Sequence, residues 1–192
     1  MKNKLIIAVL ISIFSFSCYA ADTPTKKKKQ TNLGLYLTAK EAYQMKTKDS
    51  HILFLDVRTR AEVAFLGMPK IADFNIPYMM VGDWDTWNDK KKNFKLTPNS
   101  GFLSTLEDKI TAKKLTKNSQ IILICRSGSR SAKATNLMAQ AGYKQVYTVV
   151  DGYEGDKAKK GMHKGQRVVN GWKNADLPWS YKLDQSKMTS DF

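Results

Sequence analysis

Residues 121–143 read IILICRSGSRSAKATNLMAQAGY, and this stretch decides the fold. It opens with four apolar residues, three of them β-branched, which is typical of a strand buried on both faces. A wholly polar run, residues 126–131, follows Cys125. Apolar residues then recur at helical spacing as far as Gly142, which stands where a helix would end. The pattern predicts a strand, a tight polar loop and a helix, with Cys125 at the strand's C-terminal end.

The loop between Cys125 and the predicted helix has the chemistry of an anion cradle. Its backbone N–H groups are unpaired and meet the positive end of the helix dipole. Gly128 allows the chain to curl around a central point, and Arg126 and Arg130 add fixed positive charge. Such a site favours a thiolate and holds an anion beside it. We expect Cys125 to be a nucleophile that attacks an anionic substrate and forms a covalent intermediate. The alternative is an inert core thiol.

The composition fits one globular domain with an excess of positive charge. The chain has 192 residues, with 32 Lys and Arg against 17 Asp and Glu, for a net charge of +15. The lysines are scattered and accompany no aromatic platform, so we expect no nucleic-acid partner. Three interpretations of the positive charge remain open. It would steer small anions to the site, attract the chain weakly to an anionic membrane, or simply reflect a solvated surface with no binding role.

The first twenty residues resemble a secretory signal peptide. Lys2 and Lys4 precede an apolar run, residues 5–16, which is short for a membrane span. Cys18 and Ala20 supply small residues at the −3 and −1 positions of a cleavage site. We therefore expect cleavage after Ala20, export to the periplasm, and no stable membrane insertion afterwards. A lipoprotein with a lipidated Cys18 and an uncleaved anchor are the alternatives.

Cleavage would leave Cys125 as the lone cysteine of the mature chain. Disulfides persist in exported compartments, and an unpaired thiol there is exposed to oxidation. A lone cysteine in such a protein therefore indicates a functional thiol rather than a packing residue.

Apolar runs alternate with helix-start signals along residues 33–180. Capping boxes at Thr38-Ala39-Lys40-Glu41 and Thr59-Arg60-Ala61-Glu62 start two helices. Strands are expected at 33–37, 51–57, 72–76, 121–124 and 145–150, a further helix after 98–100, and a short final helix near 171–179. This order predicts an α/β fold, with a mainly parallel central sheet flanked by helices on both faces.

The remaining segments lack this pattern. We expect residues 21–32 to be a basic disordered linker and residues 181–192 a frayed tail. Two long loops, at about 78–100 and 154–171, are unusual in a compact domain. Trp84 and Trp87 in the first loop would cover the site or, as the pattern favours, pack on the domain's flank.

The motifs, taken in order, resemble those of a single-domain rhodanese, a sulfurtransferase, over about residues 33–180. The matching pieces are Leu55-Asp56-Val57-Arg58 with Glu62, Asn75-Ile76-Pro77, Cys125-Arg126-Ser127-Gly128-Ser129-Arg130-Ser131, Ala141-Gly142-Tyr143, Val146-Tyr147, Asp151-Gly152, Gly171-Trp172 and Leu177-Pro178. The resemblance implies a rhodanese-like fold. It also implies that Cys125 takes a sulfur from a donor such as thiosulfate and passes it, as a persulfide, to a thiophilic acceptor: cyanide, a thiol or a protein.

The resemblance also implies roles for the other motif residues. Residues 126–131 would bind the substrate, with Arg126 and Arg130 neutralising the sulfonate end of the donor. Asp56 and Arg58 would form a supporting ion pair at the sheet edge. The reaction needs no metal and no organic cofactor.

Two features depart from the family pattern. Gly67 is followed by Met68, where the family often has a histidine, and the two long loops at 78–100 and 154–171 look like insertions. These insertions leave the acceptor open.

Three other functions are weighed against sulfur transfer. A non-catalytic binding or regulatory module would keep the fold without turnover. A cysteine phosphatase or arsenate reductase would need a longer loop, since Arg130 follows Cys125 after only four residues. A papain-like Cys–His enzyme would have to use His51 or His163, the chain's two histidines, and neither has suitable neighbours in the sequence.

Overall fold

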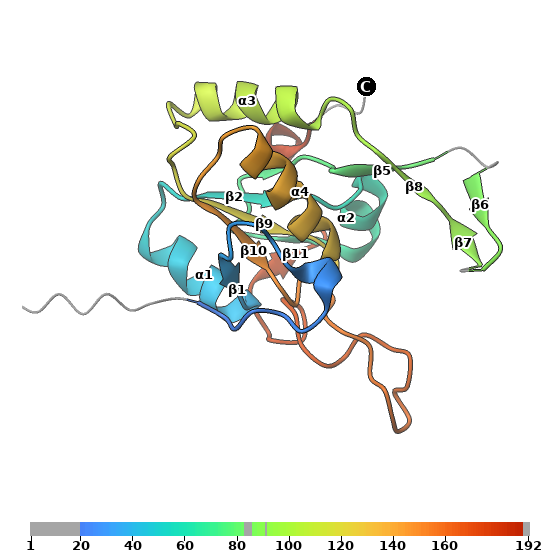
Figure 1. The fold of residues 1–192 in the computed structure, drawn as a ribbon. Coiled ribbons are helices and arrows are strands. Elements are labelled where there is room, and N and C mark those ends of the chain that lie inside the picture. Colours follow the sequence, from blue (N-terminus) through green and yellow to red (C-terminus); the bar gives the residue numbers. More distant parts are fainter. Residues whose placement is uncertain (1–19, 83–85, 91, 190–192) are drawn as a thin grey trace, which may run out of the picture.

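The computed structural model describes residues 20–82, 86–90 and 92–189 of the chain (Figure 1). The predicted signal peptide, apart from its last residue, lies outside the described residues. Within the described part, no helix is both long enough and apolar enough to cross a membrane.

Five parallel strands form the central sheet, as the sequence predicts. They are β1 (Tyr36–Leu37), β2 (Leu53–Asp56), β4 (Phe74–Asn75), β9 (Ile121–Ile124) and β10 (Val146–Val149). Their order across the sheet is β1-β10-β9-β2-β4, and each neighbouring pair is parallel. The strand that leads into Cys125, β9, is therefore central and fully buried. All five expected strands form, although most are shorter than the apolar runs that predict them.

Helices cover both faces of the sheet. They are α1 (Ala39–Lys48), α2 (Arg60–Leu66), α3 (Phe102–Ala112) and α4 (Ser129–Gln140). Alternate residues of a strand point to opposite faces, so Ile122 packs in the core of α1 and α2, whereas Ile121 and Leu123 pack in the core of α3 and α4. Both predicted capping boxes form, at Thr38 and at Thr59. They fix where α1 and α2 begin.

The first long loop forms an arm, which we define as the described residues of 79–98. In it, β5 (Met79–Val81) pairs antiparallel with β8 (Leu96–Pro98), and β6 (Trp87–Asn88) pairs with β7 (Asn93–Phe94). Figure 1 shows the arm extending away from the central sheet. Trp87 does not pack on the domain's flank: it stacks edge-to-face on Phe94, with ring centroids 5.2 Å apart. Trp84 lies outside the described residues.

The second long loop also has structure. Isolated bridges join Lys157 to Arg167 and Ala158 to Lys164, which gives a hairpin that projects from the domain (Figure 1). No final helix forms at residues 171–179. Instead, this segment turns and ends in β11 (Trp179–Ser180), which pairs antiparallel with β3 (Met68–Pro69).

Both ends of the domain are packed, contrary to the sequence-based expectation. The basic segment 21–32 contains the 3-10 helix η1 (Lys27–Lys29), and Lys29 is buried. Its Nζ donates a hydrogen bond to the Val150 carbonyl at 2.7 Å and pairs with Asp156 at 3.1 Å. The C-terminal segment contains the 3-10 helix η3 (Gln185–Lys187). Thr189 belongs to the segment that was expected to be a frayed tail, but it is buried. Its hydroxyl donates a hydrogen bond to the Asn75 carbonyl of β4 at 2.8 Å. The prediction of a disordered linker and a frayed tail is wrong for these described residues, because partners distant in sequence bury them.

Candidate active site

Cys125 follows directly on β9 and is 1% exposed. The Gly128 N–H donates to its Sγ at 3.2 Å, and the Ser131 Oγ lies 3.4 Å from Sγ. Thr148 of β10 donates to the Ser131 Oγ at 2.8 Å. The Ser131 Oγ also lies 3.2 Å from the Gly128 carbonyl oxygen. The single proton of the Ser131 hydroxyl is therefore donated either to that oxygen or to Sγ, whichever is more negative. The loop thus directs the Gly128 N–H at the sulfur and places the Ser131 hydroxyl within reach of it.

Two glycines make this tight loop possible. Gly128 adopts φ +89°, and a Cβ there would collide with the Val150 carbonyl oxygen. Gly152 adopts φ +68°, and a Cβ there would lie 2.6 Å from the Cys125 carbonyl oxygen. Only glycine tolerates both the left-handed backbone and the close approach.

The turn that contains Gly152 holds the cysteine loop through backbone hydrogen bonds. Tyr153 N–H donates to the Cys125 carbonyl at 2.8 Å, and Glu154 N–H donates to the Arg126 carbonyl at 3.0 Å. The Asp151-Gly152 motif therefore holds the backbone of the cysteine loop.

Arg130 is held by Glu62, which the sequence predicted as part of a capping box and of the first family motif. Its Nη1 and Nη2 donate to the two carboxylate oxygens of Glu62, each at 2.6 Å. Burial alone would raise the pKa of Glu62, but the hydrogen bonds and charge of Arg130 outweigh it and lower that pKa. Burial opposes the charged form of Arg130 as well, and the pairing with Glu62 overcomes it, so the pKa of Arg130 is raised. Arg130 consequently joins α4 to α2, and its charge is already balanced.

Arg126 is placed differently. Its side chain is 46% exposed, and its Nε lies 3.9 Å from a Glu154 carboxylate oxygen, a loose pairing. Arg126 and Arg130 were both predicted to bind the substrate. Of the two, Arg126 is the one whose charge remains available to a bound anion.

Asp56 and Arg58 form a fully buried ion pair. Arg58 Nη2 lies 2.6 Å from Asp56 Oδ2 and also donates to the Gly67 carbonyl at 2.7 Å. The guanidinium carbon lies 3.8 Å from the ring centroid of Tyr153. Neither residue lines the pocket over Cys125, and their supporting role stays a prediction.

A pocket of about 650 Å³ opens over Cys125. From the predicted site it is lined by Cys125, Arg126, Ser127, Ser129 and Arg130. Gly128 and Ser131 contact the sulfur but do not line the pocket. The sequence analysis missed several lining residues, which come from α2, the arm and α4: Thr59, Ala61, Glu62, Met79, Val81, Asn88, Asn93, Phe94, Lys95, Leu96 and Lys133. The signal in the sequence was the insertion at 78–100, because the arm that it forms supplies part of the wall of the pocket.

The histidines do not join this site. His163 bonds to Gln166 in the projecting hairpin, and neither it nor His51 lines the pocket. Within residues 20–82, 86–90 and 92–189, no cluster of three or more His, Cys, Asp or Glu could hold a metal ion.

Comparisons with known proteins agree with this geometry. Residues 38–159 match the rhodanese-like domain family. An uncharacterized protein of Rickettsia rickettsii is 33% identical over 141 residues, which cover 73% of this chain and 93% of that protein. Thiosulfate sulfurtransferase 18 of Arabidopsis thaliana is 35% identical over 101 residues, covering 52% of this chain and 62% of its own length.

A solved structure shows the same fold. The crystal structure of Rv0390 from M. tuberculosis aligns with a TM-score of 0.57 and 26% identity, covering 77% of this chain and 97% of that one. Together with the motif match over residues 38–159, which spans more than half of the chain, this likeness establishes that the chain belongs to the rhodanese-like domain family, which includes sulfurtransferases.

Proposed function

We propose that this protein is a sulfurtransferase that moves a sulfane sulfur from an anionic donor such as thiosulfate to a thiophilic acceptor, through a persulfide on Cys125. The observation that carries the proposal is the arrangement at Cys125. Its Sγ accepts from the Gly128 N–H at 3.2 Å, lies at the start of a helix, and borders a pocket with an exposed arginine. This arrangement places a nucleophilic sulfur beside a pocket that accommodates an anion.

The first half-reaction loads the enzyme. The Cys125 thiolate attacks the outer sulfur of thiosulfate, a new S–S bond forms, and the donor's own S–S bond breaks. Sulfite leaves with the electron pair of the broken bond. The Gly128 N–H and the Ser131 hydroxyl, the two donors near Sγ, stabilise negative charge at the sulfur in the resting enzyme.

The second half-reaction unloads it. An acceptor such as cyanide or a thiolate attacks the outer sulfur of the persulfide, and Cys125 leaves as a thiolate. The two half-reactions share one cysteine, so ping-pong kinetics are expected. No metal or organic cofactor takes part.

Charge around the pocket supports an anionic donor. Arg130 is paired with Glu62, so the cations that face the donor are Arg126 of the loop, Lys133 of α4 and Lys95 of the arm, all of which line the pocket. We assign the sulfonate to Arg126 first, because it lies next to the cysteine in the chain. Arg130 instead orients the loop through Glu62.

We further propose that the reaction takes place after export. The support is the sequence pattern of residues 1–20, a basic start, an apolar run and small residues before Ala20. In an oxidising compartment, the burial of Cys125 would protect its thiol between turnovers. Fractionation of cells that express the full chain, with mass determination of its N-terminus, tests cleavage after Ala20.

The central experiment is intact-mass measurement of the chain from Ala21 before and after thiosulfate. We expect the wild type to gain the mass of one sulfur atom and to lose it on addition of cyanide, and we expect no gain with Cys125→Ala. If a reduced, accessible Cys125 gains no sulfur from thiosulfate, the thiosulfate proposal fails. A chain that keeps its biological effect as Cys125→Ala would support a non-catalytic binding module instead.

A further inference from the structure

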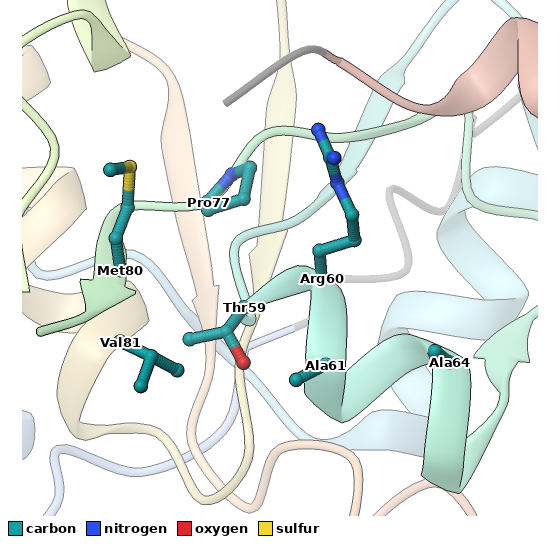
Figure 2. A pocket seen from close by; sticks show the side chains of 7 residues that line it. All are labelled: Thr59, Arg60, Ala61, Ala64, Pro77, Met80 and Val81. Atoms are coloured by element: carbon teal, nitrogen blue, oxygen red, sulfur yellow. The ribbon is translucent and has the colours of Figure 1, made fainter. Parts of the chain in front are cut away.

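The catalytic pocket continues into a second hollow along α2. This neighbouring cavity, of about 560 Å³, lies between the outer side of α2 and β5 (Figure 2). It shares Thr59, Ala61 and Val81 with the pocket over Cys125. The two hollows therefore adjoin along these residues, and together we call them the groove, which extends from Cys125 to Ala64 and Met80. A small inorganic anion would occupy only the cysteine end.

The far half of this groove is mostly apolar, and among the described residues Arg60 is the one charged residue that lines it. Ala61 and Ala64 present small side chains on α2, and Figure 2 shows Met80 and Val81 on the other side of the hollow from them. Val81 is 55% exposed, and Phe65, four residues after Ala61 on α2, is 81% exposed. Exposed apolar side chains gathered beside a site are typical of surfaces that bind a partner.

The groove also selects by charge. Of the residues that line its two halves, only Glu62 is acidic, and Arg130 neutralises it. Arg126, Lys95 and Lys133 surround the cysteine end. An occupant that complements this surface carries negative charge near its reactive group and apolar side chains farther away.

The strand that borders the groove offers backbone groups as well. Among the described residues, β5 pairs only with β8, so one of its edges has no strand beside it. An extended chain adds to such an edge through main-chain hydrogen bonds, while its side chains occupy neighbouring pockets.

We propose that the groove binds an extended segment of a protein acceptor, with acidic residues around a cysteine that reaches Cys125 and apolar residues that lie between α2 and β5. This inference rests on the proposed sulfur transfer and names the acceptor class. The acceptor's thiolate attacks the outer sulfur of the Cys125 persulfide, forming a new S–S bond. The bond from that sulfur to Cys125 breaks, its electron pair returns to Cys125, and no external oxidant or reductant is consumed.

The test measures how fast the preformed Cys125 persulfide is discharged. The probes are three synthetic peptides of equal length and cyanide. In the first peptide aspartates flank a cysteine and valines and leucines follow it; the second replaces the aspartates by lysines, and the third replaces the apolar residues by serines. We expect the first peptide to discharge the persulfide about tenfold faster than either of the others, because each of them loses one of the two complementary features.

A matched pair of variants locates the effect. Ala64→Glu introduces bulk and negative charge in the far half of the groove, whereas Ala112→Glu makes the same change at an exposed alanine on α3. We expect Ala64→Glu to slow discharge by the first peptide about tenfold and to leave discharge by cyanide within about twofold, with Ala112→Glu changing neither.

The outcomes separate the two proposals. Equal discharge by all three peptides, from a persulfide that forms normally and reacts with cyanide, overturns the groove but leaves sulfur transfer intact. Equal effects of the two glutamate variants also overturn the groove. A persulfide that never forms overturns the proposed function, and with it this inference.

Discussion

The cysteine loop, residues 125–131, and the arm border the same pocket but are held in different ways. The loop is fixed from several sides: the turn at Gly152–Glu154 bonds to its carbonyls, and Arg130 is paired with Glu62 on α2. The arm is held by two short antiparallel pairs, and its pocket residues Val81 and Phe94 are 55% and 46% exposed.

The difference separates chemistry from recognition. A nucleophile needs donors that are already in position when charge develops on the sulfur, and the bonded loop provides them. Recognition of a partner tolerates a surface segment of lower local stability, as loops on a rigid scaffold often are. We therefore expect changes in the loop to cost activity or global stability, and changes in the arm to affect acceptor choice.

Replacing the nucleophile gives the largest expected effect. Cys125→Ser keeps the size of the side chain but removes the thiolate, so sulfur transfer from thiosulfate to cyanide should fall by at least about 10³-fold. Steady-state kinetics measure the fall, and circular dichroism checks that the fold is retained. Activity within tenfold of wild type would show that Cys125 is not the sulfur carrier.

The loop's glycine gives the next largest effect, on stability. Gly128→Ala combines a left-handed backbone with a collision at the Val150 carbonyl, so we expect it to reduce the free energy of unfolding by about 2–5 kcal/mol. Gly161→Ala is the matched control: its φ is +74°, and a Cβ there meets nothing within 4 Å.

Urea unfolding of the two alanine variants isolates the collision. The control carries only backbone strain, so its loss should not exceed about 1–2 kcal/mol. Similar losses of unfolding free energy in the two variants would mean that the loop shifts to accept a side chain. The loop would then not be held more firmly than the arm.

The pair between Glu62 and Arg130 should give a smaller effect that depends on pH. Glu62→Gln keeps an oxygen for the helix cap but removes the charge, and we expect a loss of about 1.5–3 kcal/mol near pH 7. Since Arg130 lowers the pKa of Glu62 in the folded state, this stability is fully present above the ordinary value of about 4.3. It disappears as the pH falls through the lowered folded-state pKa.

Unfolding free energies of wild type and Glu62→Gln, measured from pH 7 down to pH 3, test this dependence. The two curves should run parallel above about pH 5 and converge below about pH 4.3. Glu107→Gln removes an acid from an exposed pair with Lys117, at 3.8 Å, and should change little at any pH. Curves that stay equally far apart at acid pH would contradict a charge-based clamp.

The parts of the fold that the sequence predicted are those encoded locally. The capping boxes at Thr38 and Thr59 need only their own first turns, and the run 121–124 is apolar enough to be central in any sheet. Lys29 and Thr189 were missed because each is buried by residues more than a hundred positions away. A run of lysines next to a proline does not reveal that one lysine will meet the carbonyl of Val150.

The same limit applies to the candidate site. Cys125, Gly128 and Arg126 belong to one short segment, so their proximity was predictable, and the sequence indicated an anion cradle there. The family resemblance implied that Arg130 binds the substrate. Its pairing with Glu62, 68 positions earlier in the chain, was not predictable, because that pairing depends on how α2 packs. The arm's place beside the pocket was likewise a tertiary outcome that an insertion alone does not specify.

The smallest expected effect concerns the arm itself. Val81→Ala removes a side chain that is 55% exposed and should change the global free energy of unfolding by less than about 0.5 kcal/mol. Val149→Ala makes the same change at a fully buried position of β10 and should cost about 2–3 kcal/mol, through lost burial and the cavity left behind. Urea unfolding compares the two. If Val81→Ala costs as much as Val149→Ala, the arm is part of the cooperative core, and its exposed apolar side chains would be there for folding. A difference of the expected size would show that the exposed apolar side chains of the arm contribute little to global stability. A surface that serves acceptor recognition is expected to have this property.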